Sequence, residues 1–201
     1  MPSPVDICNL ALGHLGDRGT VASIDPPEGS AQAAHCARFY PMARDALLEM
    51  HPWRFATRRK ALALLEVGAW TWAFAYAEPS DLLRTVAVLP PDATDDSAAQ
   101  PYDIELADSG ARAILTNQEG AVLRYVARGV DSASFPPLFV DALAWLLASY
   151  LAGPILKGDV GKDEAKRCLA AFSTSFALAT VSDASQRKSR QAHVPPWLAA
   201  R

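Results

Sequence analysis

The fold is decided by the stretch Leu47–Leu65, LLEMHPWRFATRRKALALL, where the sequence pattern changes from helix to strand. Before the change, apolar residues recur with a helical period at Cys36, Tyr40, Ala43, Leu47 and Met50. Pro52 ends this helix, because the residue that precedes a proline is disfavoured in helical angles. After Trp53 the apolar residues recur with a period of two, which is typical of a strand. We therefore predict that two bodies of different secondary structure meet at Pro52.

Two helices are predicted before the break. Ser3 is placed to cap the first, Pro4 suits its first position, and Asp6 stands where a capping box has its acid. The apolar face of this helix consists of Val5, Cys8, Leu12 and Leu15. The second helix is predicted over residues 28–50, and Pro41 inside it should kink it or divide it in two.

Residues 53–128 predict an antiparallel sheet of about five or six strands. The clearest strand is WTWAFAY, in which alternation sends Trp70, Trp72, Phe74 and Tyr76 to one side. This aromatic ladder is interpreted as core packing, with base stacking as the alternative. The last two strands are predicted as a hairpin that turns around Gln118–Gly120. Aromatic residues are dense between Trp53 and Tyr76, which suits a seam where the sheet packs on the helices.

Two further helices are predicted after Pro136 and Pro137. Residues 138–152 are apolar nearly all round, which indicates a central helix, too short to span a bilayer, that stops at Gly153-Pro154. The last helix is predicted over residues 159–181, with an apolar stripe of Leu169, Phe172, Phe176 and Ala179.

The predicted fold class is therefore α+β: a bundle of about four helices that carries an inserted antiparallel β-sheet. Residues 1–52 and 135–182 form the two halves of the bundle, residues 53–134 form the sheet, and residues 183–201 form an extended C-terminal docking arm.

Composition argues against several classes of function. The net charge of −3 gives no basic footprint for DNA over the whole surface. The three cysteines are odd in number and far apart, so we expect no disulfide framework. We expect the protein to be synthesised in a reducing cytosol. The amino-terminal sequence predicts no signal peptide. No histidine has metal-ligand spacing, the segment around Lys162 lacks the glycine pattern of a phosphate-binding loop, and there is no nucleophile elbow. We expect no catalytic residue, metal or cofactor.

Three groups of residues are candidates for surface contacts. Arg58, Arg59 and Lys60 form either a solvated strand edge that discourages aggregation or a contact with protein or DNA, and alternation places Arg59 on the opposite face from the other two. Asp103 and Glu105 share one strand face and are interpreted as exposed acids rather than a catalytic pair. The tail is either a frayed terminus or an arm that docks on a partner through Arg187, Lys188, Arg190, Pro195, Pro196 and Trp197, with the tryptophan as anchor.

Five blocks in succession carry a resemblance to a known family. They are ICNLALGHLG, CARFYPMARDALLEMHPWRFATRR, WAFAYAEPSDLLR, LTNQEGAVLRYV and FPPLFVDALAWLLASYLAGPI. In this order, over residues 5–157, they resemble the tail tubular protein A family of tailed bacteriophages. No block is diagnostic alone, because each is mostly structural; the succession is the specific signal.

The resemblance implies a helical bundle with an inserted sheet and a passive role as head-to-tail adaptor. Family members form a ring, commonly of twelve subunits, that joins the portal to the tail nozzle around the DNA exit channel. The implied partners are further copies of the chain, the portal and a nozzle or other tail protein, with double-stranded DNA passing through unbound and no membrane involved. The implied location is the head–tail junction of the virion, after assembly in the bacterial cytoplasm. A small DNA-binding module that uses the basic and aromatic strands is the alternative, and a phage-carried cell-wall hydrolase is a third hypothesis.

Overall fold

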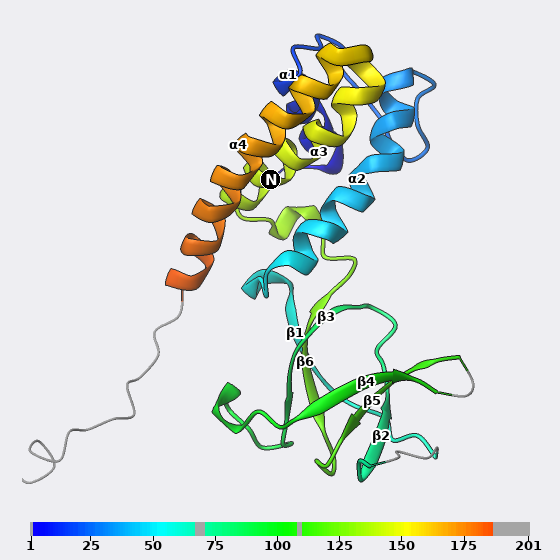
Figure 1. The fold of residues 1–201 in the computed structure, drawn as a ribbon, viewed down its shortest axis with the longest axis vertical. Helices are drawn as coiled ribbons and strands as arrows, with labels where there is room; N and C mark the ends of the chain where they lie inside the picture. Colours follow the sequence, from blue (N-terminus) through cyan, green and yellow to red (C-terminus); the bar gives the residue numbers. More distant parts are fainter. Residues whose placement is uncertain (1, 67–70, 108–109, 187–201) are drawn as a thin grey trace, which may run out of the picture.

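The computed structural model describes residues 2–66, 71–107 and 110–186, which fold into four helices and two small antiparallel sheets. The α+β class predicted from the sequence is confirmed. Figure 1 shows the helices gathered at one end of the molecule and both sheets at the other. The elements are α1 (Pro4–His14), α2 (Ala31–Met50), β1 (Thr57–Ala61), β2 (Phe74–Ala77), β3 (Leu82–Leu89), β4 (Tyr102–Leu106), β5 (Arg112–Thr116), β6 (Val122–Ala127), α3 (Pro137–Leu156) and α4 (Gly158–Ser185).

Helix α1 begins with the predicted capping box. The Ser3 hydroxyl accepts a hydrogen bond from the backbone N–H of Asp6 at 3.1 Å, and the Asp6 carboxylate accepts one from the backbone N–H of Ser3 at 2.8 Å. These bonds satisfy amide groups that a helix start leaves without partners. They also lower the pKa of the Asp6 carboxyl, because they favour its charged form.

Helix α2 runs without interruption through Pro41, so of the two predicted effects, a kink or a division, the division is wrong. Ser30 caps the helix, which therefore starts later than the expected Glu28. A proline inside a helix removes one backbone hydrogen bond, and here the nearby residues Tyr40 and Ala43 are buried in the core, which supports the helix at this point. The helix ends before Pro52, as expected.

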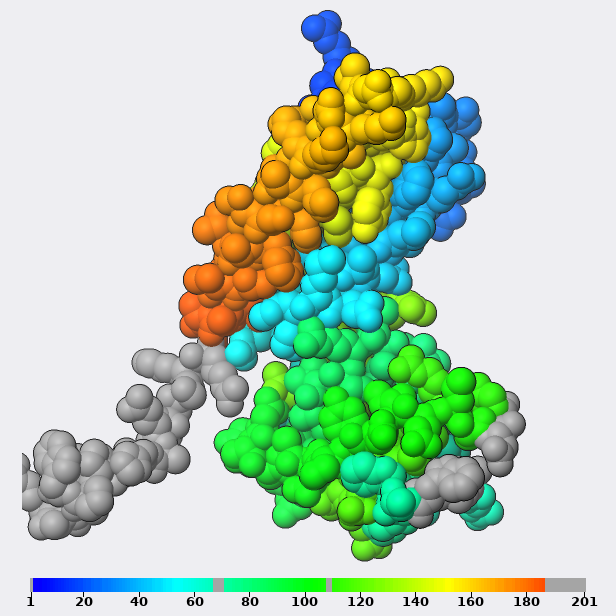
Figure 2. All heavy atoms as spheres, viewed as in Figure 1, coloured from blue at the N-terminus to red at the C-terminus, as the bar shows by residue number. Residues whose placement is uncertain are grey.

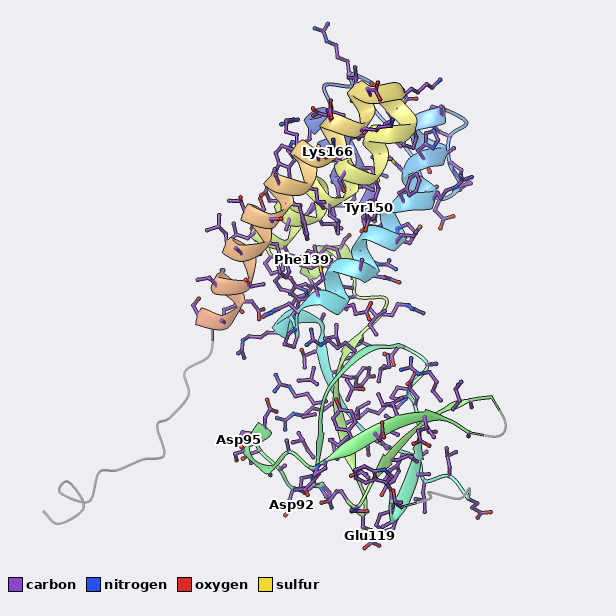
Figure 3. All side chains as sticks on the ribbon, in the orientation of Figure 1. Asp92, Asp95, Glu119, Phe139, Tyr150 and Lys166 are labelled. Carbon is purple, nitrogen blue, oxygen red and sulfur yellow. The ribbon has the colours of Figure 1, made fainter. Side chains whose placement is uncertain are left out.

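Helix α3 is the centre of the bundle and packs against α1, α2 and α4. Its buried residues lie all round the helix, and Phe139 is labelled among the helices in Figure 3. Contrary to the prediction, the helix does not stop at Gly153-Pro154 but continues to Leu156. Its twenty residues are long and apolar enough to cross a membrane by length and composition alone, so the expectation that it is too short is wrong; more than half of the span is buried inside the protein, as in a core helix.

The turn from α3 into α4 is tight. Lys157 and Gly158 both have positive φ, of 55° and 57°, and α4 starts directly at Gly158. One turn later Gly161 lies against α3, where an added Cβ would stand 2.9 Å from the carbonyl oxygen of Ala152. The absence of a side chain at Gly161 therefore permits the close crossing of the two helices.

Helix α4 runs to Ser185, four residues past the predicted end at Val181. Residues 183–185 are therefore helical, although we expected the extended arm to begin at residue 183. Leu169, predicted in the buried stripe, is 50% exposed, whereas Phe172 and Ala179 of that stripe are buried.

The strands form two three-stranded sheets, in the orders β1-β6-β3 and β2-β5-β4, instead of the single sheet that we predicted. The last two strands, β5 and β6, lie in different sheets, so the prediction that they form a hairpin is wrong. Strand β5 has β2 and β4 on its two sides, and β6 has β1 and β3, so neither has a free edge for the other. The turn at Gln118–Gly120 instead carries the chain from one sheet to the other.

Two short connections link the sheets at their corners. After β1 the chain crosses to β2, where Leu65 N–H donates to the carbonyl of Ala75 and Ala77 N–H donates to that of Ala63, both at 2.8 Å. On the other side Gln100 N–H donates to the carbonyl of Val88 at 2.8 Å. The six strands thus close around one buried cluster, formed by Tyr76, Leu82, Val88, Ile114, Ala121, Leu123, Tyr125 and Ala127.

The aromatic ladder predicted in WTWAFAY is not one-sided. Phe74 and Tyr76 pack into the cluster between the sheets, whereas Trp72 packs against Ala75, Ala113 and Leu115 in a separate small cluster. The change of face occurs because β2 starts only at Phe74, so Trp72 lies outside the regular alternation. Trp70 lies outside the described residues.

Candidate functional site

The basic strand β1 exposes its three charged residues, as the sequence suggested. In the register with β6, Arg59 lies opposite Arg124, whereas Arg58 and Lys60 lie opposite Tyr125 and Leu123. Tyr125 and Leu123 belong to the cluster between the sheets. The predicted alternation is therefore confirmed: Arg59 is on the outer face, and its two neighbours are on the inner one.

Arg58 is held by an acid from another part of the sheet body. Its Nη1 lies 3.2 Å from Oδ2 of Asp81, and the Tyr125 hydroxyl donates to the other oxygen of that carboxylate at 2.9 Å. Burial raises the pKa of the Tyr125 hydroxyl, and the hydrogen bond to Asp81 adds to this effect. The charge of Arg58 is thus paired with a carboxylate of the same chain.

Arg59 and Arg124 are like charges placed directly opposite each other on neighbouring strands, an arrangement that destabilises a sheet unless acceptors surround it. The loop after β3 supplies them. Arg59 donates to the carbonyls of Ala93 at 3.0 Å and Thr94 at 3.1 Å, and Arg124 forms an ion pair with Asp96. The neighbouring Asp95 is labelled on this loop in Figure 3.

These residues border an open hollow of about 470 Å³, lined by Arg54, Thr57, Arg59, Thr94, Asp95, Asp96 and Arg124. The lining contains three arginines and two aspartates, and each arginine already has an acceptor within the chain. The hollow is therefore a mixed polar surface rather than a cradle for a phosphate.

The acidic strand β4 is an edge strand of the other sheet. Asp103 and Glu105 are both exposed, as expected, and lie opposite Leu115 and Ala113 of β5. They therefore share the outer face of their sheet with the small cluster around Trp72. Strands β1 and β4 thus present charges of opposite sign on separate edges of the same body.

Trp53 belongs to the helical core, whereas we had expected it to begin the sheet. It is 1% exposed, its indole N–H donates to the carbonyl of Leu47 at 2.8 Å, and its ring packs edge-on against Phe139 and Phe176. Phe55 follows it and also packs on Phe139. The aromatic residues at the break thus pack α2 against α3 and α4. Phe74 and Tyr76 pack between the two sheets.

Asp183, in the last turn of α4, ties the helices to this linker. It is 5% exposed, its Oδ1 accepts from the backbone N–H of Arg54 at 3.0 Å, and its Oδ2 lies 3.3 Å from His51 Nε2 and 3.8 Å from Arg54 Nε. The guanidinium of Arg54 also donates to the backbone carbonyl of Asp183 at 3.0 Å. Sequence reasoning missed this residue because it placed residue 183 in the arm.

The docking arm predicted from the sequence follows directly after this junction. Its candidate residues Arg187, Lys188, Arg190, Pro195, Pro196 and Trp197 all lie outside the described residues. The structure therefore brings Arg59 together with the acidic loop and places Arg58 beside Asp81, and it leaves the arm as a prediction from sequence.

The outward face of α4 is another broad surface, and Figure 2 shows this helix in orange along the outside of the helical body. Between Cys168 and Gln186 the only charged residue of α4 is the buried Asp183. Leu169, Leu178 and Val181 are exposed on this half of the helix, at 50%, 57% and 69%. The face is thus uncharged and partly apolar, unlike the charged first turns.

The buried groups with reactive chemistry are part of the core. Cys8, Cys36 and Cys168 are free thiols, and a hydrogen bond with Cys36, together with burial, raises the pKa of the Cys8 thiol, which disfavours the thiolate. Burial raises the pKa of Tyr40 to about 12. Among the described residues no group of three or more His, Cys, Asp or Glu side chains is placed to hold a metal ion.

The chain was compared with known protein families and with curated proteins. It matches no family model, and no curated protein is similar to it. Its function must therefore be inferred from the residues, the fold and the surfaces described above.

Proposed function

We propose that this protein is a structural head-to-tail adaptor of a tailed bacteriophage virion, in which copies of the chain form a ring between the portal and the tail nozzle. The observation that supports the proposal most is the pair of unlike bodies, which are joined by the contact of Asp183 with Arg54 and by the ion pair of Arg128 with Asp45. A coupling piece needs two firm bodies that meet different partners, and this chain has a helical one and a β one (Figure 1). The partners and the ring of twelve come from the resemblance to tail tubular protein A.

In this proposal the helical body faces the portal and the β body faces the nozzle, as in the family that the sequence resembles. The docking arm, which follows α4 in the sequence, adds a contact with the portal through its basic residues and Trp197. Arg58, Arg59 and Lys60 serve contacts between subunits or with the nozzle. The protein carries no cofactor and catalyses no reaction.

Charge supports passage of DNA without binding. The net charge is −3, and Arg58, Arg59 and Arg124 of the β body are paired with Asp81, Asp96 and loop carbonyls. Affinity for DNA depends on cations that are free to replace counterions along the phosphates. The alternative function, a small DNA-binding module, has less support for this reason, and in a gel-shift assay at moderate salt we expect only weak binding without sequence preference.

Electron microscopy of the purified chain mixed with portal rings of the same phage tests the proposal. We expect a ring of additional density on one face of the portal, with the helical body in contact with it. The matched variant is the chain truncated after Gln186, which keeps every described residue of α4 and should remain folded but bind the portal more weakly. Full-length protein that leaves the portal bare would refute the adaptor role, and unchanged binding by the truncated chain would refute the docking arm alone.

A further inference from the structure

Strand β1, with three basic residues, is an edge strand of one sheet, and strand β4, with two acidic residues, is an edge strand of the other. Strand β1 pairs with β6 on one side, and strand β4 pairs with β5 on one side. We call Arg58–Ala61 the basic edge and Tyr102–Leu106 the acidic edge. An open edge presents unpaired amide groups to other chains, and native proteins usually protect it with charge.

The backbone groups that point outward from the basic edge follow from one hydrogen bond. Leu62 N–H donates to the carbonyl of Ala121 on the β6 side at 2.9 Å. Backbone groups alternate along a strand, so the even-numbered residues of β1 also face β6 and the odd-numbered ones face outward. The amide of Thr57 is already bound to the carbonyl of Arg54, which leaves Arg59 and Ala61 without a backbone partner outside the β1–β6 ladder among the described residues.

The same reasoning applies to the acidic edge. Ala107 N–H donates to the carbonyl of Ala111 on the β5 side at 2.8 Å, so the odd-numbered residues of β4 face β5. Tyr102, Ile104 and Leu106 then face outward, in agreement with Gln100, whose N–H reaches the neighbouring β3. The N–H of Ile104 is covered by the carboxylate of Asp103, which accepts its hydrogen bond at 2.8 Å.

We propose that the acidic edge of one copy pairs, antiparallel, with the basic edge of the next copy, with Ile104 opposite Arg59. This register places Tyr102 opposite Ala61, so the outward-facing groups of both strands meet as hydrogen-bonded pairs. The same register places Asp103 opposite Lys60 and Glu105 opposite Arg58. These two are non-hydrogen-bonded pairs, in which the Cα atoms lie about 4.5 Å apart and side chains are closest.

Charge selects both the partner and the register. Cross-strand pairs of opposite charge stabilise a sheet, whereas like charges directly opposite destabilise it. A shift by two residues in either direction retains only one of the two charge pairs, and two basic edges or two acidic edges repel. Lys60 supplies the cation that draws Asp103 away from the Ile104 amide, and Arg58 exchanges Asp81, a half-exposed partner, for Glu105.

The contact joins unlike surfaces and therefore repeats from copy to copy. Such a contact builds a ring if the rotation closes. The inference rests on the proposed adaptor function, and it specifies which surfaces of neighbouring subunits meet in the β body.

Disulfide cross-linking on portal rings tests the register. The Lys60→Cys, Asp103→Cys double variant should form disulfides between copies under mild oxidation, and a non-reducing gel should show a ladder of oligomers. The native cysteines are buried and give no background from the folded chain. In the control pair Arg59→Cys, Asp103→Cys, the two thiols lie on opposite faces of the paired strands and should yield little cross-linked product.

Charge reversal gives a second measurement that does not depend on thiols. Arg58→Glu with Lys60→Glu, or Asp103→Lys with Glu105→Arg, should each weaken assembly by about tenfold or more, because each sets like charges opposite one another. The variant with all four changes should recover it. Circular dichroism of each variant establishes that the fold is kept.

The outcomes separate this inference from the proposed function. Rings that form on the portal without the ladder and without recovery by the fourfold variant overturn the strand pairing and leave the adaptor role intact. A ladder and charge recovery in the chain alone, with no binding to the portal, support the pairing and overturn the adaptor role. No association in any mixture contradicts both.

Discussion

The carboxylate of Asp183 accepts a hydrogen bond from the backbone N–H of Arg54 at 3.0 Å, although the two residues are 129 positions apart. The first lies in the last turn of α4 and the second in the linker that leads from α2 into β1. With the return bond from the Arg54 guanidinium to the Asp183 carbonyl, this contact fixes the end of the longest helix against the start of the β body. Together with the ion pair between Arg128 and Asp45, it couples the two bodies.

Replacing Asp183 should weaken the fold at this junction. Asp183→Ala leaves the Arg54 amide without its acceptor in a nearly buried place and removes the ion pair with the Arg54 guanidinium, which should cost about 1–3 kcal/mol of the free energy of unfolding. Urea denaturation measures the loss. The control Asp159→Ala removes an acid from the exposed start of α4 and should change stability by less than about 0.5 kcal/mol. Equal effects of the two variants would contradict the role of Asp183.

Stability should fall with pH below about 6.5 because of His14, whose ring stacks on Trp145 with the ring centroids 3.6 Å apart. Burial lowers the pKa of His14, so the unfolded chain takes up a proton at a higher pH than the folded chain does. Its contribution is fully present above the unfolded pKa of 6.5 and is lost as pH falls toward the folded pKa.

The variant His14→Phe keeps a ring on Trp145 and removes the titration. Urea denaturation of both proteins at pH 7.5 and pH 5.0 should show a larger loss for the natural chain. Identical losses in the two proteins would show that His14 is not the group responsible.

Gly161→Ala should destabilise the α3–α4 crossing, since its Cβ would stand 2.9 Å from the Ala152 carbonyl oxygen and the helices would have to separate. Overpacking of this kind costs about 1–3 kcal/mol. Gly153→Ala, on the facing helix, meets no atom within 4 Å and should be neutral or stabilise by up to about 1 kcal/mol. Thermal unfolding of both variants measures the difference, and a stabilised Gly161→Ala protein would be inconsistent with the close crossing.

Asp96→Asn should increase the electrostatic repulsion between Arg59 and Arg124. Without the carboxylate, the two guanidinium groups remain opposite each other with only loop carbonyls as acceptors, and we expect a loss of about 1 kcal/mol that shrinks at high salt. Asp92→Asn, an exposed acid of the same loop, is the matched control and should have little effect. A loss that is the same at low and high salt would argue against an electrostatic cause.

The local features of the fold were predictable from sequence, because capping, period and proline signals act within a few residues. Ser3 and Asp6 form the expected box, α2 ends before Pro52, and Arg59 faces away from Arg58 and Lys60. The pairing of strands was not predictable in this way. Strand β6 pairs with β1 and β3, which lie more than thirty residues away in the sequence. The alternating pattern of VLRYVA indicates a strand but does not indicate its partners.

The junction was missed for a different reason. Asp183 continues the spacing of the buried residues Phe172, Ser175 and Ala179, so its buried position was present in the helical period. A polar residue in such a stripe indicates a partner, and extending the helix by one turn would have found it. The burial of Trp53 in the helical core was hidden because the period changes at that residue.

The central position of α3 has a consequence for biosynthesis. Helix α1 packs mainly on α3 and only slightly on α2, so the amino-terminal helices lack their main support until residues 137–156 have left the ribosome. Strands β1 to β6 are contiguous and are complete earlier, at residue 127. We therefore expect the β body to fold first in the nascent chain. The apolar faces of α1 and α2 then remain uncovered until α3 is synthesised or a chaperone binds them.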